Sequence, residues 1–384
     1  MRGLIQVTEE QQELVTMIKK FMEKEIAPHI LEFEEAGSYP PELIRAGIEM
    51  GLNVMQLPEE YGGMGLSTTT TAMLLEAGSL TESTYVSTFN ITNMGAKIVM
   101  FSGTEDQKRR YADILCNGGM GAFCLTEPNT GSDAASVQTN VVQKGDKYIL
   151  NGSKMFITNA GIADVFLVVA TMEPGTGYKG LATFMVERSR PGITVGKKED
   201  KMGMRLSNTC PIFFDNVELP LENLIGEKGQ GFANAMKVLE MSRPLVAASS
   251  VGSCRRATDL ALNYAQERVQ FGKPICKFEA VQMMLADMEM LTEAARALTY
   301  DACALIDAHI PCPKEAAMCK CFASDAYQKV STDAIQIFGG YGTMKEYQIE
   351  KLYRDSKITQ IVEGSNQIQR FVIAKQMLKE RPHT

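Results

Sequence analysis

The residues of this sequence that could carry chemistry are a glutamate before a glycine, Glu363-Gly364, and two glycine clusters. A carboxylate becomes a general base when its surroundings raise its affinity for protons. Taken alone, however, a glutamate before a glycine is more often a surface residue at a helix end. Backbone amides of the clusters, residues 226–231 and 339–342, could hold a phosphate. The first cluster lacks the order of a P-loop or dinucleotide fingerprint and is more simply a loop before a helix, and the second is equally compatible with a helix end.

Two other groups of side chains suggest ligands but have simpler readings. Arg268 offers a guanidinium fork that suits a phosphate, yet next to Glu267 it also resembles half of a solvated surface pair. Cys319 and Cys321 lie near His309 and Cys312, but their spacing matches no common zinc pattern. The chain has 9 cysteines in no framework spacing, which predicts reduced thiols and no metal site.

Length and charge limit the class of protein. A chain of 384 residues exceeds one ordinary core and predicts two or three domains. With 46 acidic and 39 basic side chains, its formal charge of -7 argues against nucleic acid or an anionic membrane as the main partner. No apolar run approaches ~18 residues and no targeting signal is evident, so we expect a cytoplasmic protein without membrane spans.

Three zones of different pattern must position these residues. Residues 1–120 are predicted to be helical, beginning with a capping box from Thr8 to Gln11. Residues 121–230 contain short β runs, with a hairpin turn at 144–147 and the next strand ending at Asn151-Gly-Ser153. In residues 231–384 helical spacing returns, with one apolar stripe over 281–298. The sequence therefore predicts an α+β fold of three domains with these boundaries.

Six segments, taken together, resemble the acyl-CoA dehydrogenase family in order and spacing over essentially the whole chain. They are residues 123–133 (FCLTEPNTGSD), 151–159 (NGSKMFITN), 201–205 (KMGMR), 267–273 (ERVQFGK), 336–342 (QIFGGYG) and 362–370 (VEGSNQIQR). The resemblance implies an N-terminal all-α domain, a middle β-barrel or sandwich domain and a C-terminal four-helix bundle. It also implies FAD as cofactor, acyl-CoA substrates, a homotetramer, and an electron-transfer flavoprotein as electron acceptor.

The resemblance also assigns residues to the ligands. Those expected to bind FAD are Phe123, Leu125, Thr126, Ser132, Phe156, Thr158, Arg268, Phe271, Gln336, Gly339, Gly340, Ser365 and Gln367. Those expected to contact the acyl-CoA are Ser132, Met241, Arg243 and Gly364. The dinucleotide end of the cofactor is expected to be held partly by a neighbouring subunit.

The resemblance identifies Glu363 as the catalytic base. In the family this base stands either at the position of Glu363 or on a bundle helix immediately before the residue matching Arg243, and the latter position is Ser242 here. A serine cannot serve as such a base. The implied reaction is abstraction of the proton next to the thioester carbonyl together with hydride transfer to flavin, giving a 2-enoyl-CoA.

The acyl pocket in this family is lined partly by the helix matching residues 85–100. This stretch has no arginine and Lys97 as its only lysine, so we expect no dicarboxyl-CoA substrate, because family members that accept one carry an arginine there. Its Thr88, Asn90, Thr92 and Asn93 suggest a short, cyclic or functionalised acyl group.

Departures from the family at the flavin and three alternative functions also have to be considered. Phe156 replaces a usual tryptophan and Phe123 a common tyrosine, which changes the hydrogen-bonding groups expected around flavin. The same fold could work as an enoyl-CoA reductase or form a diene in a cyclic acyl-CoA. A flavin-holding scaffold without turnover is a third alternative, and the presence of Glu363 argues against it.

Overall fold

The computed structural model describes residues 7–381, and its N-terminal part is helical. Its α-helices are α1 (Glu9–Phe21), α2 (Ile30–Ala36), α3 (Pro41–Glu49), α4 (Thr68–Ser79), α5 (Ser83–Ser102) and α6 (Glu105–Cys116). The predicted capping box at Thr8 and Gln11 is confirmed, and α6 starts with a second one. Helices α4 and α5 are buried along most of their length, so they form the inner layer of this part.

A mixed sheet follows the helices. Its strands are β1 (Gly121–Cys124), β2 (Asn140–Lys144), β3 (Lys147–Thr158), β4 (Val165–Thr171), β5 (Leu181–Glu187), β6 (Ile193–Val195), β7 (Thr209–Pro220) and β8 (Leu224–Ile225). They form one sheet of 8 strands in the order β6-β7-β3-β2-β4-β5-β8, with β1 paired to β4. Every residue of β4 is buried, which matches its unbroken apolar run.

The prediction that the strand after the 144–147 turn ends at Asn151-Gly-Ser153 is wrong. Strand β3 continues to Thr158, with a register shift against β7 between Leu150 and Gly152. Gly152 has a φ of 140°, which side-chain-bearing residues rarely adopt, and a Cβ there would lie 2.7 Å from Thr139. The glycine thus makes a bulge rather than a strand end, since a bulge lets the ladder resume after one irregular residue.

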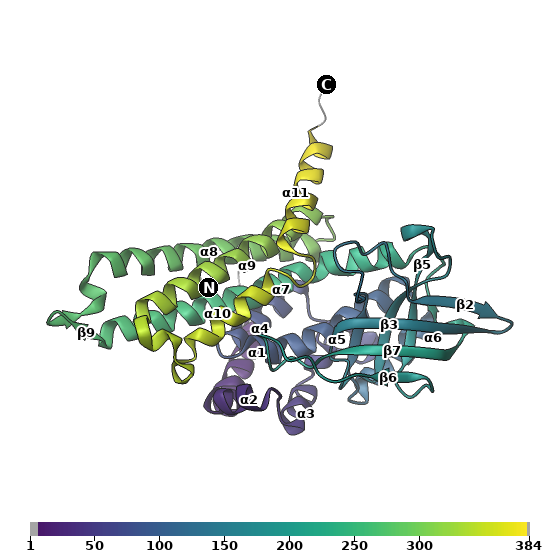
Figure 1. Ribbon diagram of the computed structural model, residues 1–384, viewed down its shortest axis with the longest axis horizontal. Coiled ribbons are helices and arrows are strands. Elements are labelled where there is room, and N and C mark those ends of the chain that lie inside the picture. The colour runs from purple at the N-terminus through teal and green to yellow at the C-terminus, as the bar shows by residue number, and fades with distance from the viewer. Residues whose placement is uncertain (1–6, 382–384) are drawn as a thin grey trace.

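The C-terminal part is a bundle of long helices. They are α7 (Gly231–Glu267), α8 (Glu279–Asp307), α9 (Pro313–Phe338), α10 (Ile349–Thr359) and α11 (Asn366–Glu380), and a small hairpin of β9 (Val269–Gln270) and β10 (Lys273–Pro274) joins α7 to α8. Figure 1 shows α7 running from the sheet to the opposite end of the molecule, where β9 lies, and α11 projecting from the body. At 1.5 Å per residue, the 37 residues of α7 span roughly 55 Å.

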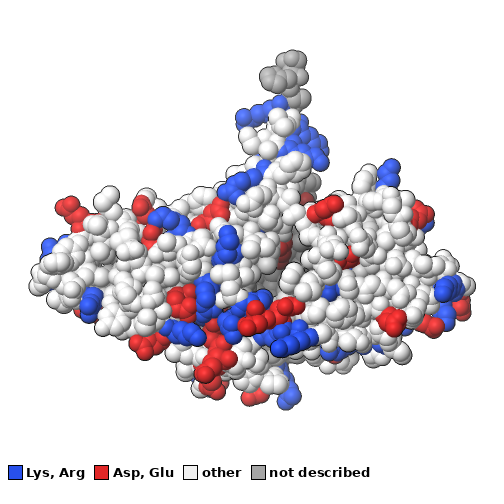
Figure 2. All heavy atoms as spheres, viewed as in Figure 1, with Lys and Arg blue, Asp and Glu red and all other residues white. Residues whose placement is uncertain are grey.

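The predicted three-part α+β arrangement is confirmed. The stripe over residues 281–298 lies on α8 and packs in the bundle core, with Met288 and Ala295 fully buried. On the face shown in Figure 2, acidic and basic side chains are mixed and a hollow separates the helical part from the sheet. No helix within residues 7–381 has the length and apolar character needed to cross a membrane.

Helices α4 and α7 approach closely at Gly252. A Cβ on this residue would lie 2.2 Å from the carbonyl oxygen of Glu76. Such a distance leaves no room for even one methyl group, so the contact between the N-terminal helices and the bundle depends on a glycine here.

We expect Gly252→Ala to destabilise the protein by about 1–3 kcal/mol, because the added methyl group must push two helix backbones apart. Helix propensity alone gives the opposite sign, since alanine is favoured over glycine by about 1 kcal/mol. Thermal unfolding measures the difference. The control is Asn263→Ala at an exposed position of the same helix. A higher Tm for Gly252→Ala than for the wild type would contradict the clash.

Candidate active site

Glu363 lies in the short connection between α10 and α11, where two successive residues have left-handed backbones. Glu363 has a φ of 53° and Gly364 a φ of 91°. A non-glycine residue in this region is uncommon and persists only where its surroundings hold it. Gln369 does so from α11, because its Nε2 donates to the carbonyl oxygens of Glu363 at 3.1 Å and Gly364 at 2.9 Å.

Helix α9 holds the same connection from the other side through Lys320. Its side chain is fully buried, and its Nζ donates to the Gly364 carbonyl at 2.9 Å and to Oδ1 of Asn366 at 3.0 Å. Burial lowers the pKa of Lys320 to about 8, and the carboxylate of Glu363 acts in the opposite direction. The ammonium therefore clamps the backbone and places positive charge beside Glu363.

The carboxyl group of Glu363 meets the bundle at Ser242 on α7. Ser242 Oγ donates to Glu363 Oε1 at 3.1 Å, whereas Oε2 is buried without a partner among the described residues. Burial raises the pKa of Glu363, against the Ser242 hydrogen bond and the charges of Lys320, Arg243 and Lys97. The arrangement gives a carboxylate with one oxygen anchored and one available, and with increased proton affinity.

Ser242 and Glu363 are the two positions that the sequence analysis compared for the base. The structure brings them into contact although 121 residues separate them. Arg243 follows Ser242, is buried, and its Nε has no partner among the residues described. Met241, half-buried, precedes them on α7. These residues therefore gather around one carboxylate, together with Gly364.

A second group of predicted residues lies along β1 and β3. Leu125 and Thr126 follow β1, and the backbone N–H of Met155 in β3 donates to the Thr126 carbonyl at 2.8 Å. Phe156 has a φ of 58° and an exposed fraction of 59%, so its ring stands free of the sheet's core. The other residues of this group are half-buried or exposed: Phe123, Leu125, Thr126, Ser132 and Thr158.

A buried ion pair joins the two segments of this second group. Lys154 Nζ lies 2.7 Å from Glu127 Oε1 and donates to the Leu125 carbonyl at 3.0 Å. The Glu127 carboxylate also accepts from the backbone N–H groups of Gln138 and Thr139. Burial acts to raise the pKa of Glu127, but Lys154 and these hydrogen bonds hold it below the ordinary value. An ionised pair thus fixes the 125–127 segment against β3.

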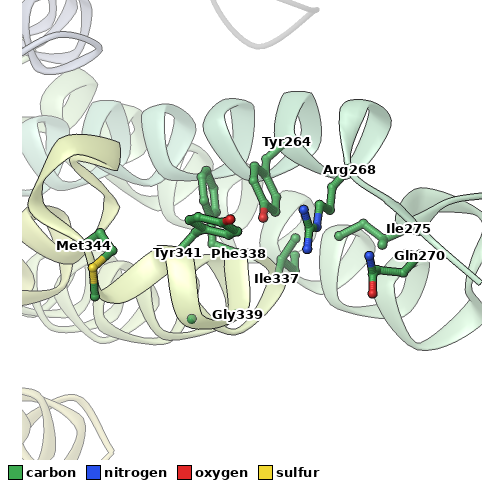
Figure 3. Close-up of a pocket in the computed structure, with 10 residues that line it drawn as sticks. Tyr264, Arg268, Gln270, Ile275, Ile337, Phe338, Gly339, Tyr341 and Met344 are labelled. Atoms are coloured by element: carbon green, nitrogen blue, oxygen red, sulfur yellow. The ribbon is translucent and has the colours of Figure 1, made fainter.

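A third group lies at the far end of α7, around a cavity of about 470 Å³. Figure 3 shows Arg268 beside this cavity with Tyr264, Tyr341 and Gly339. The Arg268 guanidinium carbon lies 5.4 Å from the centre of the Tyr341 ring. The residues that line the cavity are rich in aromatic side chains and glycines and include one cation, Arg268. This combination suits a ligand with an aromatic ring that carries phosphates.

The remaining predicted residues lie near these groups without lining the cavity. Phe271 is 93% exposed at the tip of the β9–β10 hairpin, and Gln336 is exposed at the end of α9. Ser365 caps α11 by accepting from the Ile368 N–H at 3.5 Å, and Gln367 is exposed in the first turn of that helix.

Within one chain the structure does not bring all predicted cofactor residues together. The group on β1 and β3 lies at the sheet, whereas the group around Arg268 lies at the β9 end of the bundle (Figure 1). Helix α7 runs between the sheet and that end of the bundle.

Two clamping residues, Lys320 and Gln369, were missed by the sequence analysis. Both are fully buried. The available signal was a polar side chain on the apolar face of a helix: Lys320 falls among Ala316, Ala317 and Ala323 on α9. A buried lysine needs acceptors, and that need alone predicts a nearby carbonyl or carboxylate.

Models of protein families match nearly the whole chain. The N-terminal domain of acyl-CoA dehydrogenases matches residues 8–119, the middle domain 122–217 and the C-terminal domain 229–378. The chain belongs to the acyl-CoA dehydrogenase family. It is therefore an oxidoreductase that acts on the CH–CH group of acyl-CoA thioesters, and the prediction of FAD as cofactor is confirmed.

Curated relatives cover almost the full length of the chain. An acyl-CoA dehydrogenase of Bacillus subtilis is 44% identical over 97% of this chain and 99% of its own. The cyclohex-1-ene-1-carbonyl-CoA dehydrogenase of Syntrophus aciditrophicus is 41% identical over 97% and 91%. The NADH-dependent acryloyl-CoA reductase of Anaerotignum propionicum is 39% identical over 97% and 95%.

Solved structures have the same fold. Butyryl-CoA dehydrogenase from Megasphaera elsdenii superposes with a TM-score of 0.95 at 39% identity, covering 98% of this chain and all of that one. A chain from a structure of the electron transferring flavoprotein of Acidaminococcus fermentans has the same TM-score at 43% identity, covering 98% of this chain and 100% of that chain.

We expect Lys154→Met to destabilise this protein by roughly 3–5 kcal/mol, because it leaves the Glu127 carboxylate buried without its cation. The 125–127 segment also loses its anchor on β3, so the variant is expected to bind FAD more weakly. Denaturant unfolding and the FAD content of the purified protein measure these effects. The double variant Glu127→Gln/Lys154→Met removes both charges and should recover part of the stability. Wild-type stability of Lys154→Met alone would contradict the buried-pair account.

Proposed function

We propose that this protein dehydrogenates an acyl-CoA between its α and β carbons to give the 2-enoyl-CoA, with Glu363 as the base. The observation that supports this proposal most directly is the carboxylate of Glu363, which is held by Ser242 through Oε1 while Oε2 has no partner among the described residues. An anchored, buried carboxylate of raised proton affinity suits abstraction of a weakly acidic C–H proton.

The acidity of that proton depends on the thioester carbonyl. Its developing negative charge needs hydrogen-bond donors in place. Within the described part of the chain, the Glu363 N–H donates to no protein acceptor, and it lies beyond the last residue of α10, Thr359. We propose that this N–H binds the thioester oxygen, with help from the ribityl chain of FAD. When bound, FAD supplies the hydride acceptor.

The proposed flavin contacts come from two sets of residues. Phe123, Leu125, Thr126, Ser132, Phe156 and Thr158 would hold the ring system, with Ser365 and Gln367 near it, and Arg268, Phe271, Gln336, Gly339 and Gly340 the dinucleotide end. Because α7 separates the two sets within one chain, we propose that a second subunit completes each site in a homotetramer. Large apolar side chains exposed on α8 and α11 are available for such contacts: Met283, Met290, Phe371 and Leu378.

For the acyl-CoA itself, we propose contacts from Ser132, Met241, Arg243 and Gly364; Gly364 adjoins Glu363, and Met241 and Arg243 flank Ser242 on α7. An electron-transfer flavoprotein remains the proposed acceptor, supported by the likeness to a chain from the Acidaminococcus fermentans structure. We further propose a cytoplasmic location and three domains at residues 1–120, 121–230 and 231–384.

A second candidate is the reverse reaction, or diene formation in a cyclic acyl-CoA, on the same site. The similarity to the acryloyl-CoA reductase and to the cyclohexene-carbonyl-CoA dehydrogenase supports it. Steady-state assays in both directions with saturated, unsaturated and cyclic acyl-CoA thioesters distinguish these reactions.

Glu363→Gln is expected to retain FAD but to lose at least about 100-fold in the rate of flavin reduction by substrate, the range typical of a general base. The measurement is anaerobic bleaching of the flavin absorbance by acyl-CoA in rapid mixing. Glu346→Gln, at an exposed position before α10, is the control. Near-wild-type reduction in Glu363→Gln would refute the assignment of the base.

Ser242→Ala is expected to move the acid limb of the pH profile of kcat/KM to higher pH. The base must be ionised, so activity rises with pH through the pKa of Glu363, which burial already raises. The Ser242 hydrogen bond lowers this pKa, and its loss raises the pKa further. An acid limb that stays in place or moves to lower pH would show that Ser242 does not bond the ionised base.

A further inference from the structure

Lys97 on α5 is a buried ammonium without a partner. Its exposed fraction is 9%, and its Nζ makes no hydrogen bond to any described residue. A buried charge is costly unless it is paired, so native proteins rarely keep one without a use. Burial lowers the pKa of Lys97 to about 8, which leaves the side chain mostly protonated at neutral pH.

Lys97 lies on α5, which packs against α7, the helix that carries Ser242 and Arg243. Its pKa is influenced by Glu363 and by Cys303 and Asp307 of α8, and the influence of Lys97 on Glu363 is reciprocal. Asp307 is already engaged, because its two oxygens accept from the N–H groups of Thr68 at 2.7 Å and Thr69 at 2.9 Å. Burial raises the pKa of the Cys303 thiol, which keeps it neutral.

The charge balance around Glu363 is positive. Three cations, Lys320, Arg243 and Lys97, act on this one carboxylate. Lys320 is satisfied by a carbonyl and an amide oxygen. Lys97 Nζ and Arg243 Nε have no partner among the described residues, so two of these three cations are unpaired.

Three other polar side chains of α5 are used within the fold. Asn93 donates to the carbonyls of Leu52 and Phe89 and accepts from the Gln56 N–H. Thr92 donates to the Gly121 carbonyl, and Thr88 to the Thr84 carbonyl. These three residues therefore give no support for a functionalised acyl group, and Lys97, which the sequence analysis set aside because it is not an arginine, becomes the informative residue of this helix.

We propose that Lys97 determines substrate specificity by donating a hydrogen bond to an oxygen atom on the acyl group, away from the thioester carbonyl. The oxygen belongs to a hydroxyl, an oxo or a carboxylate group, any of which offers the acceptor that the ammonium lacks. The proposal rests on the function proposed above and names its substrate class as oxygen-bearing acyl-CoA thioesters. An apolar acyl chain would leave the ammonium buried and unpaired, which disfavours that substrate.

The test compares acyl-CoA thioesters of equal chain length that are unsubstituted or carry a hydroxyl, an oxo or a carboxylate group beyond the reacting carbons. For the FAD-loaded wild type and Lys97→Met, kcat/KM is measured by flavin reduction coupled to an artificial acceptor. We expect the ratio of oxygen-bearing to unsubstituted substrate to fall roughly 10-fold or more in the variant. The substituted thioester whose kcat/KM ratio decreases most in the variant identifies the oxygen group that Lys97 binds. Equal ratios in both proteins for every arm would overturn the proposal.

Two further measurements distinguish a role of Lys97 in substrate binding from a structural role and from a general effect of removing a lysine. Lys237→Met, an exposed lysine on α7 that packs on Phe101 of α5, serves as control and should leave the ratio as in the wild type. Without substrate, Lys97→Met is expected to raise the Tm, because it removes an unpaired buried charge; a lower Tm would show a structural partner and overturn the proposal.

If no thioester bleaches the wild-type flavin, the proposed function itself fails, whereas bleaching with unaltered ratios refutes only the role of Lys97.

Discussion

The burial of one carboxylate, that of Glu363, is the constraint on which the site depends. Taking a carboxylate out of water raises its pKa, and the molecule opposes this with one serine hydrogen bond and nearby cations. As a result, Glu363 has a greater proton affinity than an exposed glutamate. The hydrogen bond and the cations still stabilise its anionic form. The left-handed backbone at Glu363 and Gly364 is held in place by Lys320 and Gln369.

The same constraint explains how distant parts of the chain cooperate. Ser242 comes from α7, Lys320 from α9 and Lys97 from α5, so the carboxylate lies where the N-terminal helices meet the bundle. The close approach of α4 and α7 at Gly252 is part of the same contact, since it sets how near these helices can pack. The sheet contributes to the site independently of this carboxylate. Its Glu127–Lys154 pair fixes the segment after β1 against β3.

Much of the architecture could be predicted because its signals are local. Capping at Thr8, the apolar run of β4 and the proline at the start of α9 each act within a few residues. The continuation of β3 past Gly152 could not be predicted in this way. Whether a glycine ends a strand or makes a bulge depends on the partner strand, here β7, which lies some 60 residues further along the chain.

The sequence by itself determined the family, the three zones and the identity of the residues proposed for the site, because motif order and spacing are properties of the chain. Only the tertiary structure decided what those residues contact. It brought Ser242 to Glu363, showed that Thr92 and Asn93 serve the fold, and left Lys97 without a partner. The physical reason is that burial and pairing, which set the pKa and the cost of each charge, arise from packing between segments far apart in sequence.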